Sequence, residues 1–183
     1  MLCSAASTPA LVSIFNGKDL TGWKVKGPEL WRAENGVLIG QSNEKKVGGL
    51  IETEKKYRDF VIELDVKYIP PGDSGVVFRT PGLQMQIGTS HSLEIELTGS
   101  FYLGKEAYPE RSTAKDTWRY FKPGAWNTLR LEARGSTFDV SVNGHHVLTY
   151  SDDKHPEAGP INLQVHNSMD MKVEFKNIRV AEL

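Results

Sequence analysis

The sequence predicts an all-β fold, a sandwich of two stacked antiparallel sheets. Apolar and polar residues alternate with a period of two in short runs, of which 62–67, 129–132 and 138–142 are the clearest. Gly, Pro, Asn or Asp bounds these runs, as is typical of strands. No segment keeps a 3.6-residue period for three turns with a cap, so no helix is expected. Roughly a dozen short strands without helices favour two sheets that share one core.

The clearest strands are expected at residues 60–68, 93–97, 129–132, 138–142, 161–165 and 173–176. The dipeptide Asn143-Gly144 separates two of them, and both residues tolerate the positive φ of a two-residue hairpin turn. The strands on either side of it should therefore be neighbours. The stretch 103–125 is the one long irregular segment, and loops of this length are often functional.

Length and composition predict one domain. The chain has 183 residues, of which 39% are hydrophobic, enough for a single core. Residues 1–12 are expected to be a disordered or processed segment, and residues 13–183 a single domain. Cys3 is the one cysteine, which excludes an internal disulfide framework. It is either a free thiol in a frayed terminus or the remnant of a bacterial lipoprotein leader.

The charge balance argues against a polyanionic partner. The formal net charge is −1, from 22 basic and 23 acidic residues, and the basic residues form no long run. No nucleic-acid partner is therefore expected. No apolar stretch approaches the roughly 20 residues that a membrane-spanning helix needs, so no transmembrane segment is expected. Nothing in the sequence selects an oligomeric state.

An unusual polar face accompanies the strand at 161–165. Ile161, Leu163 and Val165 alternate with amide side chains and are followed by His166. If the apolar residues lie in the core, then Asn162, Gln164 and His166 share the outer face. Amides donate and accept hydrogen bonds at once, which suits the hydroxyls of a saccharide. Histidine adds a base or a metal ligand, although a histidine hydrogen-bonded at a sheet end is the alternative.

Further candidates lie in the middle of the chain. Gln84 and Gln86 alternate with apolar residues and fit the same polar face, with plain strand polarity as the alternative. Arg79 shares a face with Val77 and could bind sugar hydroxyls or pair with a glutamate. Glu94 and Glu96, two apart on a strand, are predicted to share one face, where their proton affinities could separate; a solvated strand face is the alternative. Three aromatic residues could pack on a sugar ring: Tyr102, Trp118 and Tyr120.

Several phrases in order resemble one bacterial family. They are FNGKDLTGWK, GGLIETEKKYRDFVIELDVKY, DSGVVFRT, TGSFY, KPGAWNTLRLEARG, VNGHHV, GPINLQVH and VEFKNIRVAEL. Together they resemble the 3-keto-disaccharide hydrolase domain family, from Phe15 to Leu183. The resemblance implies a concanavalin A-like jelly-roll sandwich and an exported bacterial protein, periplasmic or on the outer surface. It also implies cleavage of glycosides already oxidised at carbon 3 of the sugar.

The sequence departs from the family pattern at its acidic residues. Family members usually carry a Tyr-Glu-aliphatic-Gln segment that ends in Asp, but Gln84 stands at the position of the Glu and Thr89 near that of the Asp. Either Glu94 and Glu96 take over the acidic role, or the protein only binds carbohydrate. Asp73 occupies the family's Asn position, where its side chain is expected to stabilise a loop.

The implied reaction needs three functional groups. A base removes the hydrogen that the 3-keto group acidifies at carbon 2, a donor stabilises the enolate, and an acid protonates the leaving oxygen. The base and the acid are expected among Glu94, Glu96 and His166. The substrate is expected to contact Arg79, Gln84, Gln86, Tyr102, Trp118 and Gln164. The sequence requires no cofactor, although a divalent metal could stabilise the enolate through carboxylate, amide and imidazole ligands.

Overall fold

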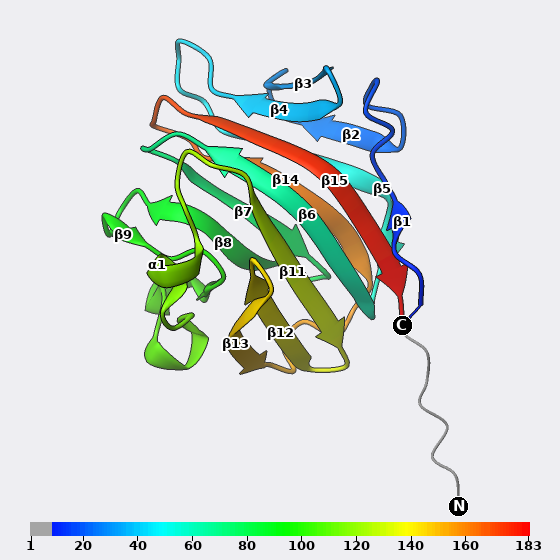
Figure 1. The fold of residues 1–183 in the computed structure, drawn as a ribbon, viewed down its shortest axis with the longest axis vertical. Coiled ribbons are helices and arrows are strands. Elements are labelled where there is room, and N and C mark those ends of the chain that lie inside the picture. Colours follow the sequence, from blue (N-terminus) through cyan, green and yellow to red (C-terminus); the bar gives the residue numbers. More distant parts are fainter. Residues whose placement is uncertain (1–8) are drawn as a thin grey trace, which may run out of the picture.

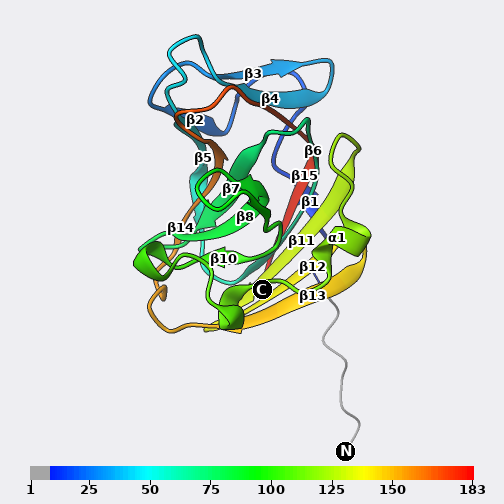
Figure 2. The same ribbon diagram turned by 90° about the vertical axis from the view of Figure 1, so that its left-hand side faces the viewer.

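The structure, a computed structural model, describes residues 9–183 and consists of two antiparallel sheets packed face to face (Figure 1; Figure 2). Sheet A has the strand order β13 (His145–Ser151), β12 (Thr137–Val142), β11 (Asn127–Arg134), β6 (Phe60–Tyr68), β15 (Lys172–Glu182), β4 (Val37–Gln41) and β3 (Trp31–Glu34), and β1 (Val12–Ser13) pairs with β15. Sheet B has the order β10 (Phe101–Tyr102), β8 (Leu83–Ser90), β7 (Asp73–Phe78), β14 (Gly159–Val165), β5 (Gly49–Tyr57) and β2 (Trp23–Lys26), and β9 (Ile95–Glu96) pairs with β8. The predicted jelly-roll sandwich is confirmed.

Period-two alternation places the core between the sheets. Ile161, Leu163 and Val165 on β14 are at most 1% exposed, as the sequence predicts. Aromatic rings join the layers: Phe78 of sheet B packs edge-on against Phe138 of sheet A, with ring centroids 5.4 Å apart. Since these strands bury one face each, their remaining side chains must point out of the sandwich.

The predicted hairpin at Asn143-Gly144 is confirmed. Asn143 has φ of 49° and Gly144 has φ of 80°, the left-handed values that a type I′ turn requires. β12 and β13 pair directly on either side of this turn. The turn also anchors a neighbour, because Asn143 Oδ1 accepts a hydrogen bond from the backbone N–H of Thr128 at 2.7 Å.

The predicted strand at 93–97 is wrong for its first half. Residues 91–94 form a turn, closed by the hydrogen bond from Glu94 N–H to the Ser90 carbonyl at 2.8 Å. Glu94 has φ of 56°, outside the strand region, and only Ile95–Glu96 pair with β8. Glu94 and Glu96 therefore do not share a strand face. The alternation misled because its apolar members do not enter the core: Leu93 lies in the turn and is 42% exposed, and Ile95 of β9 is 56% exposed.

The irregular segment 103–125 contains the described helices, each a single turn: η1 (Gly104–Glu106), η2 (Glu110–Ser112) and α1 (Thr117–Tyr120). It runs from β10 of sheet B across to sheet A, where α1 lies beside β11 and β12 (Figure 2). The segment is part of the folded body, because Phe121 is 3% exposed and stacks on Tyr68 with centroids 5.7 Å apart. No helix within residues 9–183 is long and apolar enough to cross a membrane.

The amino-terminal segment is described only from residue 9. Cys3, and with it the choice between a free thiol and a lipoprotein remnant, lies outside the described residues. The predicted boundary after residue 12 falls within β1, in which Val12 pairs with Val180 of β15.

Candidate functional site

Polar side chains of three neighbouring strands gather on the outer face of sheet B. β8, β7 and β14 lie side by side, and their outward positions carry carboxamides and one carboxylate. With residues of the adjoining loops they enclose a cavity of about 180 Å³, which we call the central groove. Its lining consists of Asp73, Gln84, Gln86, Ser90, Ser92, Tyr102, Tyr108, Gln164 and His166.

The glutamines of the central groove form one hydrogen-bonded network. Gln84 Nε2 donates to Gln86 Oε1 at 3.1 Å and to Gln164 Oε1 at 3.2 Å, which links β8 to β14 across β7. Gln86 Nε2 donates to Asp73 Oδ1 at 2.8 Å, and the hydroxyl of Tyr108 donates to Gln86 Oε1 at 2.7 Å. A carboxylate can only accept, so this contact fixes the orientation of the Gln86 amide. The network holds the groove in one arrangement before a ligand binds.

A glycine on the intervening strand makes this network possible. Gly75 pairs with Gln86 in the β7–β8 ladder and occupies an outward position. A Cβ added to Gly75 would lie 2.8 Å from Gln84 Cγ and 2.9 Å from its Nε2, closer than such contacts allow. The missing side chain therefore leaves the space in which the amides of β8 and β14 meet.

Asp73, at the start of β7, supplies the carboxylate of the central groove. It is 5% exposed, and its Oδ2 accepts a hydrogen bond from the backbone N–H of His91 at 2.7 Å. This contact fixes the turn after β8, so the predicted loop-stabilising role is confirmed. The sequence interpretation nevertheless missed that Asp73 also faces the groove. The signal was present: residues 73, 75 and 77 share one face of the strand.

His166 follows β14 and faces Asp73 across the central groove. Its Nδ1 lies 2.6 Å from the carbonyl of Asn167, and its Nε2 lies 3.9 Å from Asp73 Oδ2. A carbonyl only accepts hydrogen bonds, so Nδ1 carries the proton in the neutral ring and Nε2 keeps its lone pair. The side chain of His166 is 29% exposed. The arrangement therefore offers a base with a fixed tautomer beside an anion that can stabilise its protonated form.

The structure brings together five of the nine predicted site residues: Gln84, Gln86, Tyr102, Gln164 and His166. Glu96 lies outside this lining. Its carboxylate accepts from Thr98 N–H at 2.9 Å and from the Tyr68 hydroxyl at 2.6 Å, and the contact with Tyr68 links β9 to sheet A. Burial, reinforced by the adjacent Glu96 carboxylate, raises the pKa of Tyr68. Glu94 is exposed in its turn, also outside the central groove.

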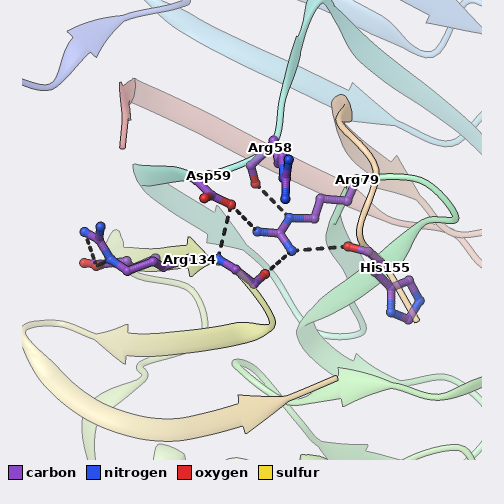
Figure 3. A network of polar contacts seen from close by, with 7 residues as sticks. Arg58, Asp59, Arg79, Arg134 and His155 are labelled. Carbon is purple, nitrogen blue, oxygen red and sulfur yellow. Dashed lines mark hydrogen bonds and ion pairs between the residues drawn. The ribbon is translucent and has the colours of Figure 1, made fainter. Parts of the chain in front are cut away.

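Arg79 was predicted to contact the ligand, but the structure places it outside the lining of the central groove. Its side chain is 1% exposed and is held by residues 58–59, 135 and 155, which lie in the connections between strands (Figure 3). Nε donates to the Arg58 carbonyl at 2.7 Å, Nη2 pairs with Asp59 Oδ1 at 2.9 Å, and Nη1 donates to the carbonyls of Gly135 and His155. The backbone leaves the strand at Arg79, where φ is 60°, so strand alternation no longer sets its direction.

Trp118 also lies outside the central groove. It sits on α1 with 71% of its surface exposed, and the guanidinium of Arg119 lies 5.1 Å from its ring centroid. Tyr102 in contrast lines the groove, and its ring centroid lies 5.6 Å from that of Tyr108. The aromatic surface beside the amides is therefore built by these two tyrosines, of which the sequence analysis named only Tyr102.

The donor set of the central groove does not make a metal site on its own. Within residues 9–183, no group of three or more His, Cys, Asp or Glu side chains is placed to hold an ion. Asp73 already accepts two hydrogen bonds, and one nitrogen of His166 faces the Asn167 carbonyl. A divalent metal therefore remains a prediction from the sequence.

A buried histidine near Arg79 gives a testable pH dependence of stability. Burial lowers the pKa of His155 below 6.5, although Asp152, whose Oδ2 lies 3.6 Å from His155 Nδ1, opposes that shift. The unfolded chain therefore binds this proton at a higher pH than the folded chain does. We expect the free energy of unfolding to fall as the pH drops below about 6.5, and to fall less in His155→Gln. Urea unfolding between pH 5 and 8 measures both slopes; equal slopes in the two proteins would contradict the assignment.

Comparisons with known proteins agree with this fold. The family model for the 3-keto-alpha-glucoside-1,2-lyase-like domain matches residues 10–181. A Parabacteroides distasonis protein provisionally described as a glycosyl hydrolase superposes with a TM-score of 0.72 at 22% identity, over 94% of each chain. A carbohydrate-binding module from Bacillus subtilis superposes with a TM-score of 0.62 at 18% identity, over 86% of this chain and 93% of its own.

A galectin-like protein of unknown function from Bacillus subtilis, 14% identical, superposes with a TM-score of 0.60 over 89% of this chain and 90% of its own. A search of curated proteins found no match. At these identities the solved structures establish the sandwich fold alone. The family model covers nearly all of the described residues, and the chain therefore belongs to the 3-keto-alpha-glucoside-1,2-lyase-like domain family.

Proposed function

We propose that the protein cleaves glycosides oxidised at carbon 3 of the sugar, with His166 as the base and the central groove as the active site. The observation that carries this proposal is the His166–Asp73 pair, with Nε2 and Oδ2 3.9 Å apart on an amide-lined face. Membership of the family supplies the substrate class. This assignment replaces the pair Glu94 and Glu96 with Asp73 as the acidic residue of the site.

The reaction follows from the acidity that the ketone creates. His166 Nε2 removes the proton from carbon 2, and the electron pair forms an enolate with the 3-keto oxygen. The enolate then expels the group on carbon 1, which leaves as an alcohol after it takes up a proton, such as the one held by His166. Water added across the resulting double bond regenerates the 3-keto sugar, so the net reaction is hydrolysis.

The surrounding groups stabilise the charges that develop. Asp73 lies next to the imidazolium that forms when His166 takes up the proton. The carboxamide oxygen of Gln164 already accepts from Gln84, and its N–H groups can donate to the enolate oxygen. Tyr102 and Tyr108 provide apolar ring surface for the sugar.

Incubation with matched substrates tests the proposal. The protein is mixed with 3-keto-glucosides and with the same glucosides before oxidation, and the released aglycone is quantified by chromatography. We expect release from the keto forms alone, because only these have an acidic hydrogen at carbon 2. The assay is run with and without EDTA, which tests the metal prediction separately. Equal release from both forms would contradict elimination.

A carbohydrate-binding module without turnover is the second candidate. Gln84 stands where the resemblance leads us to expect a glutamate, and a carbohydrate-binding module shares the fold. The same incubation distinguishes the two candidates when binding is measured in parallel by calorimetry. Binding of the keto-glucosides without any release would favour the module.

A further inference from the structure

Two cavities adjoin the central groove. The first, which we call the tyrosine cavity, has a volume of about 440 Å³ and shares Gln84 and Tyr102 with the groove. The second, the glycine cavity, has a volume of about 350 Å³, contains Gly48 and shares Gln164 and His166 with the groove. Gln84 Nε2 donates to Gln164 Oε1 at 3.2 Å, so the side chains that lead into the two cavities touch each other. The three spaces therefore form one continuous cleft.

The strand order puts the two cavities on opposite sides of the central groove. β10 and β8, which carry Tyr102 and Gln84, lie on one side of β7, and β14 and β5 lie on the other. The cavities also lie toward opposite ends of β7, because Val77 pairs with Gln84 whereas Asp73, at the start of the strand, faces His166. The cleft runs diagonally from β10 to β5 and crosses four strand spacings, about 19 Å. A single sugar ring cannot fill that length.

The walls of the tyrosine cavity suit a sugar ring. Tyr102 is 44% exposed and offers the face of its ring, and Val77 and Pro81 add hydrocarbon beside it. The amide of Gln84 and the exposed ammonium group of Lys154 can hydrogen-bond hydroxyls. A sugar has both kinds of surface, apolar C–H faces and a rim of hydroxyls, so it matches this combination.

The glycine cavity begins beside the proposed base. His166 lines both this cavity and the central groove, and the side chains of Gln164 and Asn167 provide amides for hydroxyls. Val47, which is 41% exposed, supplies apolar surface. Gly48 lies so close to the end of β14 that an added Cβ would stand 2.7 Å from Asn167 N, so a ligand meets backbone there and no side chain. The glycine cavity therefore also suits a sugar.

The proposed reaction orients the keto sugar along the cleft. Carbon 2 must lie at His166, where the central groove meets the glycine cavity. The leaving group is attached to the neighbouring carbon 1 and therefore lies nearest the glycine cavity. Carbons 4 and 5 lie on the other side of the ring, so substituents on carbons 4 and 6 point toward Gln84 and the tyrosine cavity.

We infer that the cleft binds an oligosaccharide with the keto sugar as an internal residue. The leaving sugar lies in the glycine cavity, and a further sugar, attached through carbon 4 or carbon 6 of the keto sugar, lies in the tyrosine cavity. The inference rests on the proposed function, because it places carbon 2 at His166. It predicts action within chains of three or more sugars.

Binding of unoxidised saccharides tests the length of the cleft, since the proposed reaction cannot consume them. The probes are methyl glucoside and the di- and trisaccharides of glucose with 1,4 or 1,6 linkages, each titrated into the full chain and followed by calorimetry. We expect Kd to fall with each added sugar in at least one series. From methyl glucoside to the trisaccharide it should fall by at least about 10-fold, which corresponds to about 1.4 kcal/mol.

Two substitutions obstruct one cavity each. Val77→Phe fills part of the tyrosine cavity and Val47→Phe part of the glycine cavity, and neither residue lines the central groove. Each variant should bind the trisaccharide no more tightly than the disaccharide, while its affinity for methyl glucoside stays at the wild-type value. Ile69→Phe is the control, because Ile69 is 70% exposed and lines none of the three spaces. It should leave every affinity unchanged, and circular dichroism checks the fold of all three variants.

The chain-length series separates this inference from the proposed function. The inference is overturned if the trisaccharides of both series bind no more tightly than methyl glucoside, or if both Val77→Phe and Val47→Phe keep the wild-type affinity for the trisaccharide. Cleavage of 3-keto-glucosides without any effect of chain length would overturn the inference alone. Tight trisaccharide binding without cleavage of any 3-keto-glucoside would support the oligosaccharide cleft and overturn the proposed function alone.

Discussion

Replacing His166 with glutamine is expected to lower kcat on a 3-keto-glucoside by about 10²–10⁴-fold, the usual contribution of a general base. Glutamine keeps a polar side chain of similar reach but cannot take a proton from carbon 2. KM should change little, because the amides and tyrosines of the central groove remain in place. Initial rates of aglycone release over a range of substrate concentrations separate the two parameters.

A matched substitution controls for the chemical change itself. His146 lies on β13 of sheet A, exposed and within 2.9 Å of Thr149 Oγ1, so His146→Gln should retain the wild-type rate. A substrate deuterated at carbon 2 adds an independent readout, since slow proton removal gives a primary isotope effect in the wild type. A His166→Gln variant that keeps kcat within a few-fold of wild type would remove His166 as the base.

Asp73→Asn tests the partner of the base. The substitution keeps the shape of the side chain but removes the negative charge that faces His166 Nε2 at 3.9 Å. We expect a fall in kcat that is smaller than that of His166→Gln, because the base itself remains. Unchanged kcat in Asp73→Asn would show that the carboxylate only holds the His91 turn.

Replacing Arg79 with methionine is expected to lower the free energy of unfolding by about 3–5 kcal/mol, because it removes a buried cation that is hydrogen-bonded to several acceptors. The guanidinium is 1% exposed and satisfies Asp59 and three backbone carbonyls (Figure 3). Methionine fills similar volume but leaves those acceptors without a donor. Urea unfolding followed by circular dichroism measures the change.

A surface arginine provides the control for this prediction. Arg134 is 63% exposed and pairs with Glu132 at 3.2 Å, so Arg134→Met should cost about 0–1 kcal/mol. Ligand affinity of folded Arg79→Met should match the wild type, because Arg79 does not line the central groove. An unfolding midpoint equal to that of the wild type would contradict the structural role of Arg79.

The sequence predicted which face of the sheet each side chain points to wherever a strand was regular. Leu163 and Val165 alternate with Gln164, so the apolar pair had to enter the core and the amide had to face outward. The same reasoning placed Gln84 and Gln86 outward, and the structure agrees. These residues were predictable because side chains of a strand alternate whatever the rest of the fold does.

Strand alternation gave the wrong side-chain direction where the backbone leaves the strand. Arg79, with φ of 60°, turns away from the face that Val77 occupies, and Glu94, with φ of 56°, lies in a turn. For Asp73 the error was the reverse, because a strand residue was taken for a loop residue. Its position before an apolar run indicated a loop, but Asp73 begins β7 and faces the groove. The strand ends at Arg79 and Glu94 were not visible, because the start and end of a strand depend on hydrogen bonds from its neighbours.

The sequence by itself determined the all-β class, the hairpin at Asn143-Gly144 and the side of the strand on which each regular residue points. Local backbone geometry sets all three. Only the tertiary structure decided that β14 lies beside β7 and β7 beside β8, which brings His166 to Asp73 and Gln164 to Gln84 from 80 residues or more along the chain. Pairing between distant strands depends on the packing of the whole core, which no short stretch of sequence encodes.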